Sequence, residues 1–126
     1  MYITKDQIAM LDAGKPKPHK YRAKRTEIDG IKFDSKREAE RYRELKLMEH
    51  CEAISDLELQ PEFVLQDKFK SNGKTIRAIK YRADFKYTKD GAVIIEDVKG
   101  MKTPVYEIKK KMFLKRYPDL EFREVL

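Results

Sequence analysis

The chain has 126 residues, with 29 Lys and Arg against 22 Asp and Glu, so its formal net charge is +7. This length fits one domain, and seven Tyr and six Phe supply enough apolar surface for a packed core. The single cysteine excludes an internal disulfide and a cysteine-based zinc site. No apolar run approaches the roughly 18 residues that cross a bilayer, and the N-terminus lacks a secretory pattern. We therefore expect a cytoplasmic domain with no membrane partner.

The charge is distributed unevenly along the chain. Residues 1–25 carry seven bases and two acids, residues 26–66 carry six bases and eleven acids, and residues 67–126 carry sixteen bases and nine acids. The corresponding net charges are +5, −5 and +7. Basic ends around an acidic middle favour a polyanion as partner, and nucleic acid is the obvious one. The alternative interpretation is a charged surface that only keeps the protein soluble.

Residues 1–25 are predicted to form a short helix, over residues 4–12, followed by a basic arm. The arm, GKPKPHKYRAKR, contains two prolines and no acid, so it suits an extended segment lying along a phosphate backbone. An arm without a binding role is the alternative. The apolar residues of the short helix are a candidate homodimer surface: Ile8, Met10 and Leu11. The candidate DNA contacts of the arm are Lys15, Lys17, Lys20, Arg22, Lys24 and Arg25.

Residues 26–126 are predicted to form one α/β domain, and its elements can be taken in chain order. Turn residues, alternation and helix caps predict a hairpin over 27–33, a helix over 35–50, strands over 54–59, 63–69, 76–87 and 93–98, a helix over 103–117 and a strand over 120–125. The strand, helix and strand at the C-terminal end imply a parallel pair with a right-handed crossover. In the second helix, Val105, Ile108 and Met112 are expected to face the core.

Three places in this outline carry charge that a core-building pattern does not need. Glu38 lies on the helix face that carries the largest apolar groups, although its position after Ser35 also fits a capping box. Asp84 is the single acid on the basic face of its strand, where a solvated salt bridge is the alternative. In the strand IIEDVKG, alternation points Asp97 and Lys99 to the same face and Glu96 to the other.

Turn chemistry brings two of these acids together. If Asp90-Gly91 is a two-residue hairpin loop, opposite positions sum to 181, and Asp84 then lies across from Asp97. Like charges that face each other across a ladder are unfavourable unless a cation lies between them. A four-residue loop would keep the two acids within reach of a shared ion, whereas a one-residue slip would separate them onto opposite faces.

Carboxylates on two strands, a Glu from a helix and a backbone carbonyl are the hard oxygen ligands that Mg²⁺ prefers, with Mn²⁺ as a substitute. A metal held in this way could activate water and polarise a phosphoryl oxygen. Lys99 could hold the attacking water or neutralise charge that develops on the phosphate. The residues therefore indicate phosphodiester hydrolysis.

At these positions the chain resembles a known nuclease superfamily. The order Glu38, Asp84 and Asp97-Val98-Lys99 is similar to the restriction-endonuclease-like nucleases, whose signature is PD-(D/E)xK. The longer blocks FDSKREAERYRELK, LQPEF, YRADF and EDVKGMKT resemble a small phage and prophage nuclease family similar to Holliday-junction resolvases. Two positions depart from the signature: Ala83 replaces Pro, and Asp97 stands where Glu is commoner.

The resemblance implies a restriction-endonuclease-like fold, with a central mixed sheet of four to five strands flanked by helices in an αβββαβ core. It also implies that Asp84, Asp97 and the Val98 carbonyl bind metal, that Glu38 completes the site, and that Lys99 acts on the nucleophile. The expected activity is Mg²⁺-dependent endonucleolytic cleavage of branched or nicked duplex DNA in phage replication, recombination or packaging, by a monomer or homodimer without a small-molecule cofactor. Lys102 and Lys109 are candidate phosphate contacts, ranked above Lys110, Lys111 and Lys115. A strand-specific nickase and a non-catalytic nucleic-acid-binding protein remain alternatives.

Overall fold

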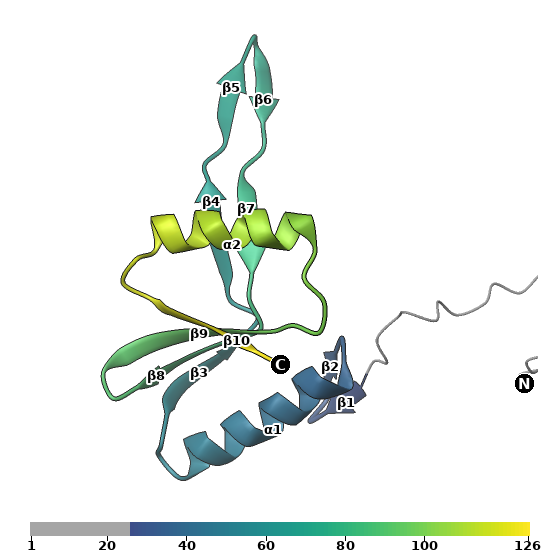
Figure 1. Cartoon of the computed structure of the whole chain (residues 1–126), viewed down its shortest axis with the longest axis vertical. Coiled ribbons are helices and arrows are strands. Elements are labelled where there is room, and N and C mark those ends of the chain that lie inside the picture. The colour runs from purple at the N-terminus through teal and green to yellow at the C-terminus, as the bar shows by residue number, and fades with distance from the viewer. Residues whose placement is uncertain (1–25) are drawn as a thin grey trace, which may run out of the picture.

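A computed structural model describes residues 26–126, so the short helix and basic arm expected over residues 1–25 lie outside the described residues. Residues 26–126 form a mixed α and β structure in which most elements are strands (Figure 1). The first hairpin joins β1 (Thr26–Ile28) to β2 (Ile31–Phe33) through Asp29 and Gly30. Both turn residues have positive φ, 55° and 77°, which is the conformation that a two-residue hairpin turn requires. The hairpin predicted from the Asp-Gly pair is confirmed.

The central sheet has four strands in the order β10-β9-β8-β3. These strands are β3 (Ser55–Leu59), β8 (Phe85–Lys89), β9 (Ala92–Val98) and β10 (Glu121–Val125). β10 runs parallel to β9, whereas β8 is antiparallel to both β9 and β3, so the sheet is mixed. The parallel C-terminal pair predicted from the sequence is confirmed.

Between β3 and β8, the chain leaves the central sheet and forms a separate two-stranded ribbon. It contains β4 (Glu62–Gln66) paired with β7 (Ile79–Arg82), followed by β5 (Phe69–Ser71) paired with β6 (Lys74–Ile76). The predicted single strand over 63–69 is therefore wrong, because β4 ends at Gln66 and β5 begins at Phe69. The predicted strand over 76–87 is also wrong, because it is divided among β6, β7 and β8.

Both helices begin and end close to the predicted residues, because their caps are local. In α1 (Lys36–His50), the Ser35 hydroxyl accepts a hydrogen bond from the Glu38 amide at 3.1 Å. In α2 (Pro104–Arg116), the Thr103 hydroxyl accepts one from the Tyr106 amide at 3.1 Å. Pro104 occupies the first turn, where its missing amide hydrogen costs nothing.

Two apolar clusters lie on opposite faces of the sheet. Neighbouring residues of β9 divide between them: Ile94 packs with Tyr42 and Leu45 of α1, and Ile95 packs with Phe113 of α2. Each helix therefore covers one face, as the arrangement of α1 and α2 in Figure 1 shows.

The predicted core face of α2 is partly wrong. Val105 and Ile108 are 61% and 59% exposed, and only Met112 of the predicted set is partly buried. The buried residues are Tyr106 and Phe113, whose rings have more apolar surface to remove from water. Among residues 26–126, neither helix is long and apolar enough to cross a membrane.

Candidate functional site

Asp84 lies where the central sheet gives way to the ribbon. Its carbonyl accepts a hydrogen bond from the Gln60 amide at 2.9 Å, and the Pro61 carbonyl accepts one from the Ala83 amide at 3.0 Å. Gln60 has a φ of 52°, so the β3–β4 chain turns sharply here beside the break between β7 and β8. Gln60-Pro61, which the sequence identifies only as a strand boundary, thus forms the bend that positions Asp84.

The Asp84 side chain is tied to the end of β9. Its Oδ2 accepts a hydrogen bond from the Val98 amide at 2.7 Å. This bond fixes the carboxylate beside Asp97 and Lys99, the residues on either side of Val98. A main-chain donor cannot move independently of its strand, so the position of Asp84 depends on the sheet itself.

The hairpin register that predicts this proximity is confirmed only as far as Phe85. Lys89 pairs with Ala92 and Phe85 with Glu96, so opposite positions sum to 181 through β8. Beyond Phe85 the ladder stops, because the Asp84 amide donates to the Glu96 carbonyl at 3.0 Å. The prediction that Asp84 lies directly across the ladder from Asp97 is therefore wrong.

Asp97 is almost completely buried, with 1% of the residue exposed. The Tyr81 hydroxyl donates a hydrogen bond to its Oδ2. The Lys99 ammonium lies 3.2 Å from Oδ1 and forms an ion pair with it. That contact does not have hydrogen-bond geometry, and Oδ1 is the one buried side-chain nitrogen or oxygen atom in residues 26–126 without a hydrogen-bond partner. An oxygen that is buried and not hydrogen-bonded is available to a further ligand.

Glu38 contributes the third carboxylate from the first turn of α1, and it is 5% exposed. Burial raises its pKa, and the negative charges of Asp34 and Asp97 raise it further. Polar contact with Asp84 acts in the opposite direction. Glu38 therefore lies among negative charges that include those of Asp34 and Asp97.

The three carboxylates strain each other electrostatically. Burial raises the pKa of Asp84 to about 7, with further contributions from the charges of Asp97 and Glu38. Lys99 lowers it, but a single ammonium does not compensate for three acids. The site is therefore poor in positive charge, and a bound cation would relieve the repulsion.

Lys99 itself is held by an aromatic ring. Its ammonium lies 4.6 Å from the centre of the Tyr106 ring, an arrangement in which the ring face attracts the cation. The Tyr106 hydroxyl in turn donates to Glu124 Oε2 at 2.6 Å. Tyr106 comes from α2 and Glu124 from β10, so both elements help to fix the direction of the lysine.

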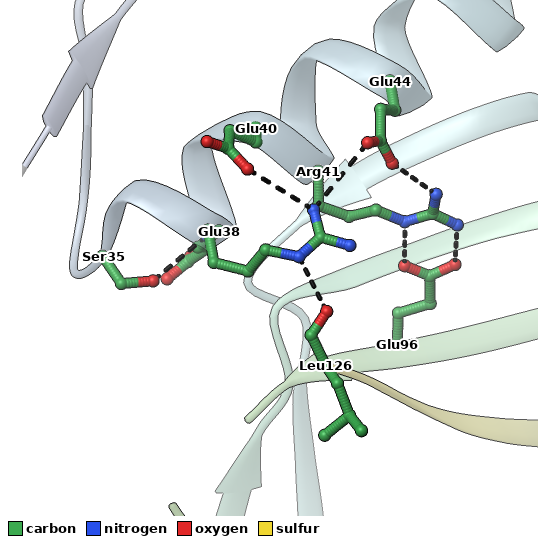
Figure 2. Close-up of polar contacts among 8 residues, drawn as sticks. Ser35, Glu38, Glu40, Arg41, Glu44, Glu96 and Leu126 are labelled. Carbon is green, nitrogen blue, oxygen red and sulfur yellow. Dashed lines mark hydrogen bonds and ion pairs between the residues drawn. The ribbon is translucent and has the colours of Figure 1, made fainter. Parts of the chain in front are cut away.

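Glu96 points away from this cluster, as strand alternation predicts. It is fully buried on the α1 side of the sheet, where Arg41 donates from Nε to Oε1 at 2.8 Å and from Nη2 to Oε2 at 2.6 Å. Figure 2 shows this two-pronged contact, in which the guanidinium faces the carboxylate. The Tyr87 hydroxyl also donates to Oε2. The charge of Glu96 is thus compensated within the fold.

Of the predicted DNA contacts, Lys102 and Lys109 lie among the described residues. All six contacts of the arm fall outside residues 26–126. Lys102 pairs with Glu124 Oε1 at 3.1 Å, and Lys109 lies half-buried on α2. Lys110 also pairs with Glu124, at 3.2 Å from Oε2.

Three residues contact the cluster in ways that the sequence did not predict. Tyr81 is buried, and its bond to Asp97 is not anticipated from the sequence. Tyr106 and Glu124 are not anticipated either. Strand alternation alone places Tyr81 on the face of Phe85 and Tyr87, which pack on the α1 side, whereas Tyr81 packs on the α2 side. The break between β7 and β8 reverses the face, so only the folded chain brings Tyr81 to Asp97.

The donor set fits a divalent metal in its chemistry. Glu38, Asp84 and Asp97 offer carboxylate oxygens, the ligands of Mg²⁺ and Mn²⁺, and Asp97 Oδ1 is buried without a hydrogen bond. Within residues 26–126, no three Asp, Glu, His or Cys side chains are already arranged in coordinating geometry. Binding would therefore require these side chains to move toward a shared ion.

Comparison with known proteins identifies the family. No curated protein and no solved structure matches the chain. A family model described as "Protein of unknown function (DUF1064)" matches residues 18–126, which include all the described elements and part of the basic arm. The chain therefore belongs to the DUF1064 family.

Proposed function

We propose that the protein is a metal-dependent endodeoxyribonuclease of the restriction-endonuclease-like fold, acting on branched DNA. The observation that carries this proposal is the meeting of Glu38, Asp84 and Asp97 beside Lys99. Burial and neighbouring negative charges raise the pKa of Glu38 and of Asp84, and such a group of acids is costly for a fold that needs them only for structure. The mixed four-stranded sheet with a helix on each face agrees with the expected core.

Each residue has a separate role in the proposed reaction. Asp84, Asp97, Glu38 and the Val98 carbonyl would hold Mg²⁺, which supplies a Lewis acid for the phosphoryl oxygen and a more acidic bound water. Lys99 would orient the attacking water and stabilise negative charge on the phosphate. Tyr81 keeps Asp97 oriented through its hydroxyl.

The test is cleavage by purified full-length protein with Mg²⁺, compared with EDTA. We expect Asp84→Asn, Asp97→Asn and Lys99→Ala each to lower the cleavage rate by about 100-fold or more, because each removes charge at the reacting phosphate. DNA binding should persist in Lys99→Ala. Full cleavage by all three variants would contradict the proposed site.

Matched controls come from the other end of the β8–β9 hairpin. Asp90→Asn changes an acid in the turn, where its φ of 49° is one that Asn also adopts. Lys89→Ala removes a lysine from the same hairpin. Both should cleave like the wild type. Calorimetric titration with Mn²⁺ should show binding that is lost in Asp97→Asn and retained in Asp90→Asn.

The preferred DNA structure rests on the family resemblance and needs its own comparison. Four-way junctions, nicked duplexes and linear duplexes of matched sequence should be cleaved at different rates, with the junction fastest. Cutting of one strand in a linear duplex would favour the nickase instead. Binding without cleavage of any substrate would favour the non-catalytic alternative.

A further inference from the structure

We propose that the hairpin formed by β5 and β6 is a second DNA-binding element, separate from the carboxylate cluster. Residues 67–78 connect β4 to β7 and form a hairpin arm, here called the arm, which is not the basic arm near the N-terminus. It projects away from both helices and from the central sheet (Figure 1). Every residue of β5 and β6 is exposed. The core therefore does not require this arm, and its side chains are available to a partner.

The hairpin is well formed despite this exposure. Phe69 pairs with Ile76, Lys70 with Thr75 and Ser71 with Lys74. The turn contains Asn72 and Gly73 at φ values of 50° and 75°, the conformation of a tight hairpin turn. The arm thus presents its side chains from a regular ribbon.

Positive charge dominates the arm. Residues 67–78 contain one acid, Asp67, and four bases: Lys68, Lys70, Lys74 and Arg77. Asp67 forms an ion pair with Arg116 of α2 at 3.2 Å. Within residues 26–126, none of the four bases has an ion-pair partner, whereas Lys102 and Lys110 are both paired.

The base of the arm is also hollowed. A depression of about 480 Å³ is lined by Lys68, Arg77, Ala78 and Lys80. Three of these four residues are cationic, and Arg77 offers a planar fork of donors that suits a phosphate group. Lys80 also contacts Glu62 at 3.7 Å, but both side chains are more than half exposed, so this pair is weak.

One pair of exposed apolar residues adds a different kind of contact. Phe69 is 46% exposed and Ile76 is 38% exposed, and they lie opposite each other on one face of the hairpin. A two-stranded ribbon fits the major groove, which is roughly 12 Å wide and presents apolar methyl groups as well as polar edges. A surface with cations beside an exposed apolar pair therefore suits duplex DNA as a partner better than it suits a protein surface that carries only acidic groups.

The position of the arm is compatible with a site at Asp84. Twelve residues separate Asn72 at the tip from Asp84, and an extended chain rises roughly 3.3 Å per residue, so the tip lies at most about 40 Å away. One turn of B-DNA is about 34 Å long. The tip of the arm is therefore separated from the carboxylate cluster by little more than one turn of a duplex at most, a span that one duplex can cover. This link depends on the proposed function, whereas DNA binding by the arm does not.

The test measures the binding of full-length protein to a fluorescently labelled linear duplex by anisotropy, in EDTA so that metal-dependent cleavage does not occur. We expect Lys70→Gln/Lys74→Gln to weaken binding on the order of tenfold at low salt. Its plot of log affinity against log salt concentration should be shallower by about 1.8, which is about 0.9 for each lost phosphate contact. Arg77→Gln alone should lower the slope by about 0.9.

The matched control is Arg43→Gln/Lys46→Gln, which removes the same charge from exposed positions on α1. It should bind with the slope of the wild type. Phe69→Ser should weaken binding and leave the slope unchanged, because an apolar contact releases no counterions. Circular dichroism should give the same melting temperature for the arm variants and the wild type, since all the changed side chains are exposed.

Several results would overturn the proposal. These are wild-type affinity and slope in Lys70→Gln/Lys74→Gln, an equal loss in the α1 control, and arm-dependent binding to duplex RNA but not to DNA. Arm-dependent DNA binding by a protein that cleaves no DNA would support this proposal and would count against the proposed nuclease. The two proposals therefore fail separately.

Discussion

Glu96 and Asp97 are adjacent, equally buried carboxylates, but their surroundings differ. Glu96 receives two hydrogen bonds from Arg41 and one from Tyr87, which satisfy both of its oxygens. Asp97 has Tyr81 on one oxygen and only an ion pair with Lys99 at the other. At the scale of single residues, Glu96 thus belongs to a structural ion pair with Arg41, whereas Oδ1 of Asp97 is available to bind a ligand.

The Arg41–Glu96 pair gives a stability prediction. Arg41→Ala should lower the free energy of unfolding by about 3–5 kcal/mol, because it leaves a buried charge without its partner. Urea denaturation followed by circular dichroism measures this loss. The control is Arg37→Ala on the same helix, whose contacts with Glu40 and Glu44 are 4.0 and 3.8 Å long and exposed. That variant should lose about 1 kcal/mol or less, and equal losses would show that the buried pair has no special role.

At the scale of elements, α2 shows how two apolar stripes compete for the core. At 3.6 residues per turn, Tyr106, Phe113 and Tyr117 lie along one line of the helix, and Val105 and Ile108 lie on another. The first stripe is aromatic but includes Lys110, which pairs with Glu124 and lies over the Phe122 ring. Because Lys110 makes the aromatic stripe less hydrophobic, the hydropathy pattern favours the stripe of Val105 and Ile108, which is exposed in the structure.

The packing of α2 can be tested with one substitution from each stripe. Phe113 is fully buried, so Phe113→Ala should cost about 3–5 kcal/mol through lost burial and a cavity. Ile108 is 59% exposed, so Ile108→Ala should change the free energy of unfolding by about 0.5 kcal/mol or less. Urea denaturation of both variants checks this. A large loss in Ile108→Ala would restore the face predicted from the sequence.

At the scale of the whole molecule, Glu124 joins α2 to the last strand of the sheet. It accepts a hydrogen bond from Tyr106, and it pairs with Lys102 and Lys110. The Tyr106 bond lowers the pKa of Glu124 from 4.5 to about 2, with further contributions from the two lysines. Glu124 also lies opposite Asp97 in the β9–β10 ladder, and the two lysines offset the negative charge of this fourth acid beside the cluster.

A lowered pKa in the folded state predicts acid sensitivity. The contribution of Glu124 to stability is present above pH 4.5 and is lost as the pH falls toward 2, because the unfolded chain takes up the proton first. Glu124→Gln should therefore remove about 1 kcal/mol of pH-dependent stability and give a flatter profile across this range. Urea denaturation at a series of pH values measures it. Glu121→Gln, at an exposed position of the same strand, should leave the slope as it is in the wild type.

Much of the local structure could be predicted because it depends on neighbours in sequence. Ser35 and Thr103 begin helices by accepting bonds from amides three residues ahead. Asp90-Gly91 fixes the β8–β9 register at a sum of 181. That register, together with strand alternation, was enough to select Asp84 and Asp97 as neighbours, although the ladder ends before it reaches them.

The sequence by itself determined the turns, the caps, the alternation of faces along β9, and which charged residues were unnecessary for a core. Only the tertiary structure decided that Gln60-Pro61 bends the sheet at Asp84, that Arg41 neutralises Glu96 and that aromatic residues of α2 face inward. It also decided that residues 67–78 project as a basic hairpin. The physical reason is the same in each case. Caps and tight turns are closed by hydrogen bonds within a few residues, whereas burial and charge compensation depend on groups that lie far apart in the chain.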